Sequence, residues 1–262
     1  MYWLGYSSMW YRAGGDQPSA FQVKINSNLS LETRAILLDT ISWTSKAFVS
    51  EELELAHQKE GAPLQKLWQE LEPSPQSNQS SHDREHAFSL AIAAGRAADE
   101  GAAQDNPTHH WHVYQAYKQL IAGSEAKGAQ PVDKPNSTDE PPEESLRLEA
   151  LTYINNQRRA LHNRRLFRTR NGRYGVGHRT LERGDMCGVI RGANVPFVLR
   201  RAESELGCNG QIVQDQANAY RLVGEAYIQG IMKGEALDML DADSRNSPSD
   251  VCAVAEVDIV LL

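Results

Sequence analysis

The sequence predicts an α+β protein in which a helical region accompanies a small antiparallel β-barrel formed mainly by the C-terminal third of the chain. Between residues 164 and 228, short apolar runs of strand length alternate with turn residues such as Asn171-Gly172 and Gly184-Asp185. Closely spaced short strands with turn signals are typical of a hairpin-built sheet that closes on itself. Between residues 49 and 122, apolar residues recur every three or four positions instead, which predicts amphipathic helices.

Residues 1–48 are expected to form an N-terminal aromatic segment followed by strands. Residues 21–25 (FQVKI) alternate apolar and polar positions, and residues 35–41 (AILLDTI) form a mostly apolar run. We expect these strands near residues 21–41 to join the later barrel, although the helices separate them from it in sequence. The aromatic residues before Gly14-Gly15 admit two interpretations: a patch left by a lost partner domain, or a surface that contacts another protein.

The helical region is expected to span residues 49–122. Amphipathic spacing predicts one helix over Pro63–Leu71 and another over Asp83–Asp99. A further helix is predicted to run from His110 to Ile121, with Thr108 as its N-cap.

Residues 123–144 are rich in Gly, Pro and acidic side chains and contain few apolar residues. Such a segment cannot bury enough surface to offset the entropy of ordering, so we expect a disordered linker. The last segment, residues 145–262, is predicted to hold one more helix, then the barrel strands. A polar loop over residues 242–250 and a final strand within residues 251–262 close the chain.

The composition is that of an ordinary globular protein, with 40% hydrophobic and 23% charged residues among 262. A formal net charge of −7 argues against a dominant non-specific role on nucleic acid, because phosphate binding needs a positive surface. The cysteines, Cys187, Cys208 and Cys252, form neither a CxxC pair nor a disulfide framework, which favours a reducing compartment. No signal peptide or membrane span is evident, and we therefore expect a cytoplasmic protein.

No sequence pattern predicts an enzyme, a cofactor or a metal site. Gly172, Gly175 and Gly177 lack the strand–helix context of a dinucleotide loop, so we interpret them as hairpin glycines. His109 and His112 are spaced so that they could face one metal ion, but no third ligand is evident.

Two acidic residues, Glu225 and Glu235, could form a carboxylate pair. Glu225 falls in a predicted strand, where a core acid needs a partner, and Arg200 is the candidate partner. We interpret Glu225 as part of a structural ion pair or as a hydrogen-bonded acid, and not as an acid/base catalyst. Cys187 lies inside an apolar strand and is expected to be a small buried hydrophobe.

Arginines dominate between residues 158 and 201, where the only acids are Glu182 and Asp185. Alternation along the hairpin could place Arg168, Arg170 and Arg173 on one face, beside aromatic residues. Such a face is typical of a barrel that binds nucleic acid. The alternative is a solvated face that neutralises the acidic linker or a partner domain.

The same part of the chain carries an ordered series of motifs. A T-x-x-G-x-x-G hairpin is followed by a Gly-Asp turn, a Pro-Phe-x-Leu-Arg strand and a closing Val-Gly-Glu-x-Tyr-x-x-Gly-Ile-Met-x-Gly-Glu segment. The positions are Thr169, Gly172, Gly175, Gly177, Gly184, Asp185, Gly192, Pro196, Leu199, Arg200, Gly224, Glu225, Tyr227, Gly230, Met232, Gly234 and Glu235. This order resembles the C-terminal region of fungal heterokaryon-incompatibility (HET-domain) proteins, closely over about the last hundred residues and loosely over the helices before them.

The resemblance implies a non-enzymatic accessory or regulatory module of fungal self/non-self recognition, or allorecognition. In that family an effector HET domain precedes this region, and its Trp-Ile-Asp-x-x-Cys-Ile-Asn-Gln-like motif has no counterpart here. The expected partner is therefore a HET-domain effector, in cis or in trans, that this protein would restrain or read out. Two alternatives stay open: a nucleic-acid-binding barrel that uses the arginine face, and a truncated gene fragment without independent function.

Overall fold

The computed structural model describes residues 11–15, 24–25, 30–49, 53, 63–71, 80–97, 101–123, 143–202, 218–243 and 254–262. The chain divides into two compact units. The first, here named the barrel unit, comprises Met1–Thr44 and Arg165–Leu262, and the second, the helical unit, comprises Ser45–Arg164. The helical unit is thus inserted, in sequence, between two parts of the barrel unit.

The strands of the barrel unit are short, apart from β2 (Leu31–Thr44) and β7 (Ala219–Ile228), each of which pairs with several other strands. The others are β1 (Lys24–Ile25), β3 (Arg164–Thr169), β4 (Tyr174–His178), β5 (Met186–Ile190), β6 (Phe197–Arg201) and β8 (Ala255–Leu261). Helix α6 (Glu235–Asp243) lies between β7 and β8 in sequence.

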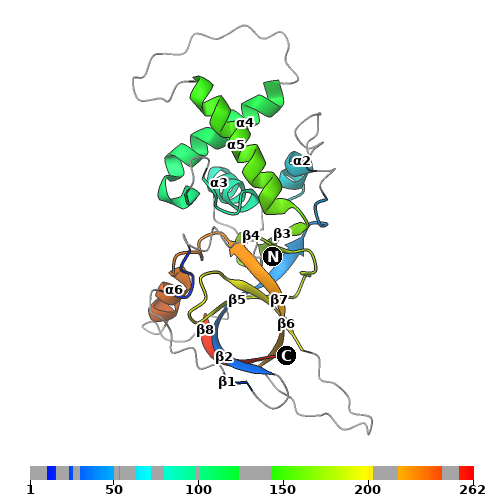
Figure 1. Ribbon diagram of the computed structural model, residues 1–262, viewed down its shortest axis with the longest axis vertical. Helices are drawn as coiled ribbons and strands as arrows, with labels where there is room; N and C mark the ends of the chain where they lie inside the picture. The colour runs from blue at the N-terminus through cyan, green and yellow to red at the C-terminus, as the bar shows by residue number, and fades with distance from the viewer. Residues whose placement is uncertain are drawn as a thin grey trace. The chain divides into compact units, whose positions relative to one another are not determined.

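These strands pair into a closed ring, which confirms the predicted α+β fold with a barrel-like sheet (Figure 1). Strand β2 pairs with β5 along one edge, and along the other edge with β8 and then β3. Strand β7 pairs with β6 on one edge, and with β8 and β4 on the other. The order β2-β3-β4-β7-β6-β5 therefore returns to β2. The β7–β8 pairing is parallel, so the sheet is not antiparallel throughout.

The strands expected near residues 21–41 do join the barrel. β1 pairs with the start of β2, and residues 21–23 lie outside the described part of the chain. β2 changes register twice, between Leu37 and Asp39 against β5, and between Ile41 and Trp43 against β3. Such bulges bend a strand and increase its twist, which helps a sheet to close. At the second shift the Ser42 hydroxyl lies 3.0 Å from the carbonyl oxygens of two successive β3 residues and can donate to them.

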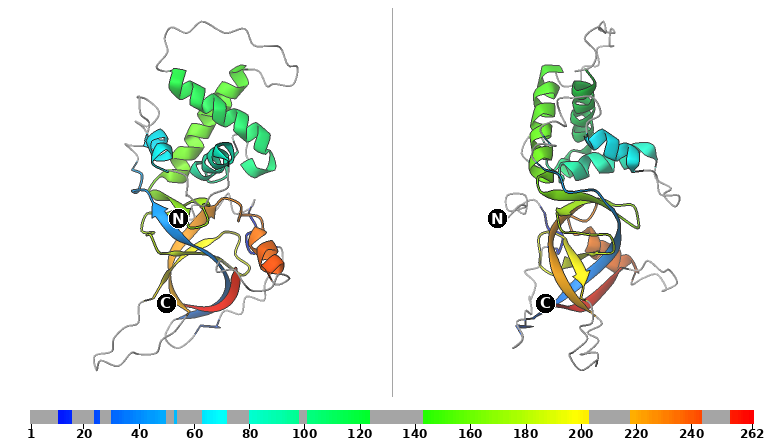
Figure 2. Two further views of the ribbon diagram at one scale, coloured as in Figure 1. Left: turned by 180° about the vertical axis from the view of Figure 1, so that it is seen from behind. Right: turned by 90° about the vertical axis from the view of Figure 1, so that its right-hand side faces the viewer.

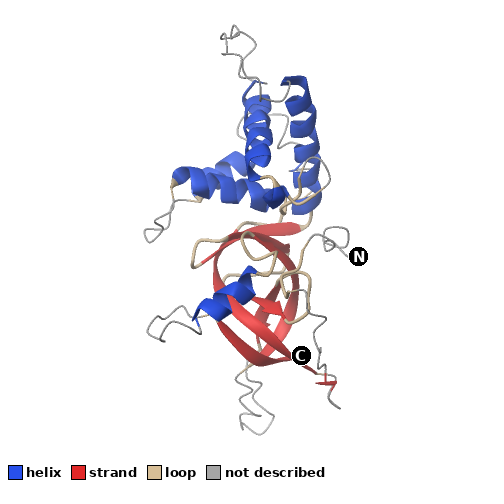
Figure 3. Ribbon diagram, turned by 90° about the vertical axis from the view of Figure 1, so that its left-hand side faces the viewer, coloured by secondary structure: helices blue, strands red, loops and turns tan. Residues whose placement is uncertain are grey.

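Alternation along the strands places apolar side chains on both faces of the sheet. One cluster includes Ile36, Cys187 and Val198, and it is covered by Ala13 and by apolar residues of α6. Figure 3 shows α6 lying against the strands. The other cluster takes one or more residues from each of β2, β5, β6, β7 and β8. The sheet therefore contributes to two separate apolar clusters.

Helix α6 has no counterpart among the predicted elements. The sequence motifs end at Glu235 and a polar loop is predicted from residue 242, whereas the structure has a helix from Glu235 to Asp243. Gly234, with φ of +97°, turns the chain into it, and the Leu237 amide donates to the Gly234 carbonyl at 2.8 Å. Residues 244–250 of the predicted loop lie outside the described residues.

The helical unit contains α2 (Pro63–Glu70), α3 (Ser81–Ile92), the short 3₁₀ helix η2 (Ala103–Asp105), α4 (Pro107–Gly123) and α5 (Glu143–Leu161). Helices α4 and α5 pack against each other (Figure 2). Helix α5, grouped by the sequence with the C-terminal strands, has its contacts with α3 and α4 in this unit. The predicted linker falls almost wholly on residues 124–142, outside the described residues.

Two predicted helix boundaries are wrong, each for a local reason. Helix α3 ends at Ile92 and not at Asp99, because Ala94 and Gly95 have positive φ. The Gly95 amide donates to Leu90 O and the Ala94 amide to Ala91 O, which is a Schellman ending. Helix α4 begins at Pro107, and its capping side chain is Asn106, whose Oδ1 accepts from His109 N at 3.1 Å.

A polar group lies within the aromatic core of the helical unit. His110 is buried, its Nε2 lies 3.0 Å from the Ser89 hydroxyl, and Tyr153 donates to the Ser89 carbonyl at 2.6 Å. Burial, reinforced by the nearby His86 and His109, lowers the pKa of His110 to about 3. The folded protein therefore holds this imidazole neutral.

No helix in the described part of the chain is both long and apolar enough to cross a membrane.

Replacing Gly175 in β4 with alanine should destabilise the barrel unit. A Cβ at this position would lie 2.3 Å from Cζ of Phe167 and 2.5 Å from the backbone oxygen of Tyr227. The expected loss in free energy of unfolding is about 1–3 kcal/mol, measured by urea titration. Gly101→Ala is the matched control, because its Cβ would meet nothing within 4 Å. Equal losses in the two variants would show that the close packing around Gly175 is unimportant.

Stability should fall as pH drops below the ordinary His pKa of 6.5. Between this value and a folded-state pKa of about 3, the unfolded chain binds one more proton than the folded chain, so lowering the pH favours unfolding. The slope approaches about 1.4 kcal/mol per pH unit. Between pH 7 and pH 5, His110→Gln should flatten the curve and exposed His112→Gln should not. Parallel curves for the parent protein and His110→Gln would contradict the buried neutral imidazole.

Candidate functional site

A charge pair links the turn before β5 to strand β6. Asp185 is 3% exposed, and its two carboxylate oxygens accept from Nε and Nη2 of Arg200 at 2.8 and 3.0 Å. Asp185 Oδ2 also accepts from the Glu182 amide at 2.7 Å, and Arg200 Nη2 donates to the Thr180 carbonyl at 2.8 Å. The hydrogen bond to Asp185 raises the pKa of Arg200, so the guanidinium stays protonated.

The predicted pairing of Arg200 with Glu225 is wrong, and register explains why. Met186 pairs with Leu199 across β5 and β6, which places Asp185 beside Arg200. On the other edge of β6, Arg200 lies opposite Arg221, whereas Glu225 lies opposite Phe197. Glu235 is the first residue of α6, where its carboxylate accepts from the Lys233 amide. Glu225 and Glu235 therefore have separate surroundings and do not form a carboxylate pair.

The glycines of the motif series occupy turns and tightly packed strands of the barrel unit. Positive φ angles occur at Gly172, Gly184, Gly224, Gly230 and Gly234. Gly177, in β4, packs so closely against Leu181 that a Cβ would lie 2.7 Å from Cδ2. Near them, the Pro196 carbonyl accepts from Ala226, and the fully buried Tyr227 ring lies 6.1 Å from that of Tyr11. These positions shape the barrel and do not converge on one chemical centre.

The three arginines of the predicted nucleic-acid face have different surroundings. Arg168 is half-buried on β3, beside Trp43 of β2, and Arg170 is exposed at the hairpin. Arg173 is half-buried, and its Nη2 donates to the sulfur of Met239 at 3.5 Å. Arg173 therefore points towards α6. Nucleic-acid binding by these three residues stays a prediction.

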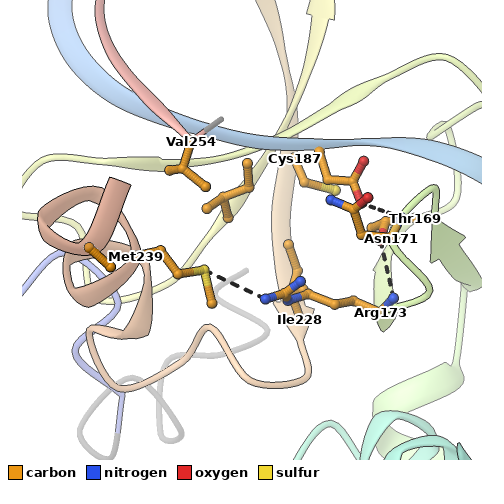
Figure 4. Close-up of a pocket in the computed structure, with 10 residues that line it drawn as sticks. Thr169, Asn171, Arg173, Cys187, Ile228, Met239 and Val254 are labelled. Atoms are coloured by element: carbon orange, nitrogen blue, oxygen red, sulfur yellow. Dashed lines mark hydrogen bonds between the residues drawn. The ribbon is translucent and has the colours of Figure 1, made fainter. Parts of the chain in front are cut away.

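The barrel unit has a pocket of about 260 Å³ beside α6 (Figure 4). The β3–β4 hairpin forms one wall of the pocket and α6 the other. The lining residues are Leu38, Asp39, Thr169, Asn171, Arg173, Cys187, Ile228, Met239, Ala242 and Val254. Apolar side chains of the core cluster thus meet a charged rim, as in many small-molecule sites.

The acidic residue of this pocket is positioned by the first bulge of β2. The register shift at Leu38 aims Asp39 at the hairpin, where its Oδ2 accepts from the Asn171 amide at 2.8 Å. Oδ1 accepts from the Thr40 amide at 2.7 Å. The hairpin is fixed further by the Arg173 amide, which donates to Thr169 Oγ1 at 3.2 Å. Both oxygens of Asp39 therefore hold backbone groups in place.

Cys187 lies at the base of the pocket and is buried, as the sequence predicts. Burial raises the pKa of its thiol well above the ordinary value, and the nearby Asp39 and Asp185 act in the same direction. The thiol stays protonated at neutral pH and is a poor nucleophile. It contributes an apolar surface to the pocket.

His109 and His112, the histidines considered for a metal site, have different surroundings. His109 Nε2 lies 2.7 Å from Glu149 Oε2, and His112 is exposed. Across the described residues, no three His, Cys, Asp or Glu side chains are grouped so that they could hold a metal ion.

The sequence singles out Thr169, Arg173 and Cys187 for other reasons, but it does not predict the pocket that they line. Asp39 and Met239 are separated by about two hundred positions, and only the ring and the unpredicted helix α6 bring them together. The one local signal was Asp39 itself, an acid within the apolar run of residues 35–41.

Comparison with known proteins gives one family match and one relative. The family described as the Het-6 beta-barrel domain matches residues 103–245, which is more than half of the chain. Heterokaryon incompatibility protein 6, OR allele, of Neurospora crassa is 33% identical over 85 residues. That alignment covers 32% of this chain and 11% of the relative, so the chain spans a small part of that protein's length. No solved structure matches.

Replacing Arg200 with leucine should destabilise the barrel unit, because the Asp185 side chain, 4% exposed, would lose its cationic partner. We expect a loss of about 2–3 kcal/mol in free energy of unfolding, less than for a fully buried pair because the Arg200 side chain is 36% exposed. Arg34→Leu is the matched control, since its ion pair with Glu256 involves an arginine that is 61% exposed, and should cost less than about 1 kcal/mol. Similar losses in urea unfolding would contradict this account.

Proposed function

Because the chain belongs to the Het-6 β-barrel domain family, we propose that it acts in fungal heterokaryon incompatibility as a non-enzymatic accessory module. The family match includes the whole motif series between residues 164 and 235, so the resemblance inferred from those motifs is confirmed. In the proposed role the protein restrains or reads out a HET-domain effector, supplied in cis or in trans. We place this activity in the cytoplasm, where the free thiol of Cys187 stays reduced.

The observation that carries the proposal is the extent of the family match. It begins in η2 of the helical unit and ends just after α6 of the barrel unit, so it takes in elements of both. The relative's name assigns heterokaryon incompatibility to that whole protein. The present chain aligns with 11% of it, and a module that works with an effector domain is consistent with this share.

An exposed apolar face on α5 is the surface that we propose for the effector. Leu148 and Leu151 are 66% and 45% exposed. They are three residues apart and therefore lie on the same side of the helix. Large apolar side chains left exposed together are typical of protein contact surfaces.

Co-precipitation and titration with HET-domain proteins of the same fungus test this function. The full chain should bind at least one of them, and Leu148→Ser/Leu151→Ser should weaken the binding about tenfold or more, since two interface leucines lose their burial. Arg147→Ser is the control, because this exposed neighbour on α5 carries the same change in helix propensity.

Failure to bind any HET-domain protein would overturn the proposed function. Binding that is unchanged in the double variant would retain the function but remove α5 as its surface. Thermal unfolding of all variants should be nearly the same, because the substituted side chains are exposed.

A further inference from the structure

The pocket beside α6 has a cation whose hydrogen-bonding capacity is largely unused. A guanidinium carries five N–H donors and prefers carboxylate or phosphate oxygens. Within the described residues, the acceptor found for the Arg173 guanidinium is the Met239 thioether, at 3.5 Å. A thioether sulfur is a weak acceptor. Figure 4 shows the guanidinium extending across the pocket towards that sulfur.

The neighbouring carboxylate does not fill this role. Both oxygens of Asp39 accept backbone amides, from Thr40 and from Asn171, and no ion pair joins Asp39 to Arg173 in the described structure. The Asp39 carboxylate nevertheless lines the pocket. An entering anion with two charges would be repelled more strongly than one with a single charge. The rim therefore favours a monoanion.

Apart from Thr169 and Asn171, the rest of the lining is apolar. Leu38, Ile228 and Val254 line the pocket, and the Cys187 thiol is protonated and inert. The volume of 260 Å³ corresponds to roughly nine water molecules at about 30 Å³ each. This space suits an organic molecule of about ten non-hydrogen atoms. Exposed Asn171 and Ala242 line its outer side, so the pocket opens to solvent.

We propose that this pocket binds a small organic monocarboxylate, with its carboxylate on the Arg173 guanidinium and its apolar body between β7, α6 and the start of β8. The binding site belongs to the barrel unit, whereas the α5 face proposed for the effector belongs to the helical unit. Ligand binding at this pocket can therefore be confirmed or refuted independently of the proposed binding of a HET-domain effector. A ligand here would connect α6 to the β3–β4 hairpin through Arg173 and Met239.

Calorimetric titration of the full chain with phenylacetate tests the proposal, with phenylacetamide as the neutral counterpart and inorganic phosphate as the anion alone. Phenylacetate should bind in the millimolar range or tighter, and about tenfold more tightly than either of the others. Arg173→Gln should weaken phenylacetate binding about tenfold and leave phenylacetamide unchanged. Arg170→Gln, which removes an exposed arginine from the same hairpin, should have no effect.

A second variant protects the test against misfolding of Arg173→Gln. Ala242→Trp fills the pocket from its exposed rim and should abolish phenylacetate binding while the melting temperature stays close to that of the parent. The proposal is overturned if phenylacetate does not bind, if the amide or phosphate binds equally well, or if Arg170→Gln and Arg173→Gln behave alike.

Discussion

The bidentate pair between Asp185 and Arg200 is the interaction on which the barrel unit depends most. The Asp185 carboxylate accepts hydrogen bonds from the Arg200 guanidinium of β6 and from the Glu182 amide of its own turn. Its backbone carbonyl accepts from the Ile41 amide of β2. One residue thereby holds three segments of the ring together. A carboxylate this deeply buried tolerates its position only because each oxygen is paired with a donor. The Gly-Asp and Leu-Arg motifs, 15 residues apart in sequence, therefore form one structural unit.

Strand β2 is the second constraint, because the ring closes through both of its edges. Its length lets β8, β3 and β5 pair with it, and its two bulges adjust the direction of the strand where these partners change. The first bulge also sets Asp39 against the β3–β4 hairpin. The pocket is thus a by-product of ring closure: bending the strand displaces one side chain into a position that straight pairing would not allow.

Local patterns in the sequence were enough to predict the strands but not the partners of every charged group. Gly172 and Gly184 lie in turns between strands and have positive φ angles, which glycine adopts readily, so the sequence predicts these turns. The partner of Arg200 depended on the register of β5 with β6, which no local pattern specifies. Helix α6 was missed because it is only nine residues long, and its stability comes from packing on the core cluster. The pocket could not be foreseen without that helix.

Ring closure has a further consequence for how the protein is made. The ladder between β2 and β8 joins Leu31 to Leu261, so the Leu31–Leu37 part of this edge of β2 stays unpaired until β8 has been synthesised. The helical unit, encoded between them, can condense on the ribosome from local contacts long before that. During this interval β2 presents free backbone donors and acceptors, the kind of edge that templates aggregation. Biogenesis of the barrel therefore depends on protecting one early strand during the synthesis of more than two hundred residues.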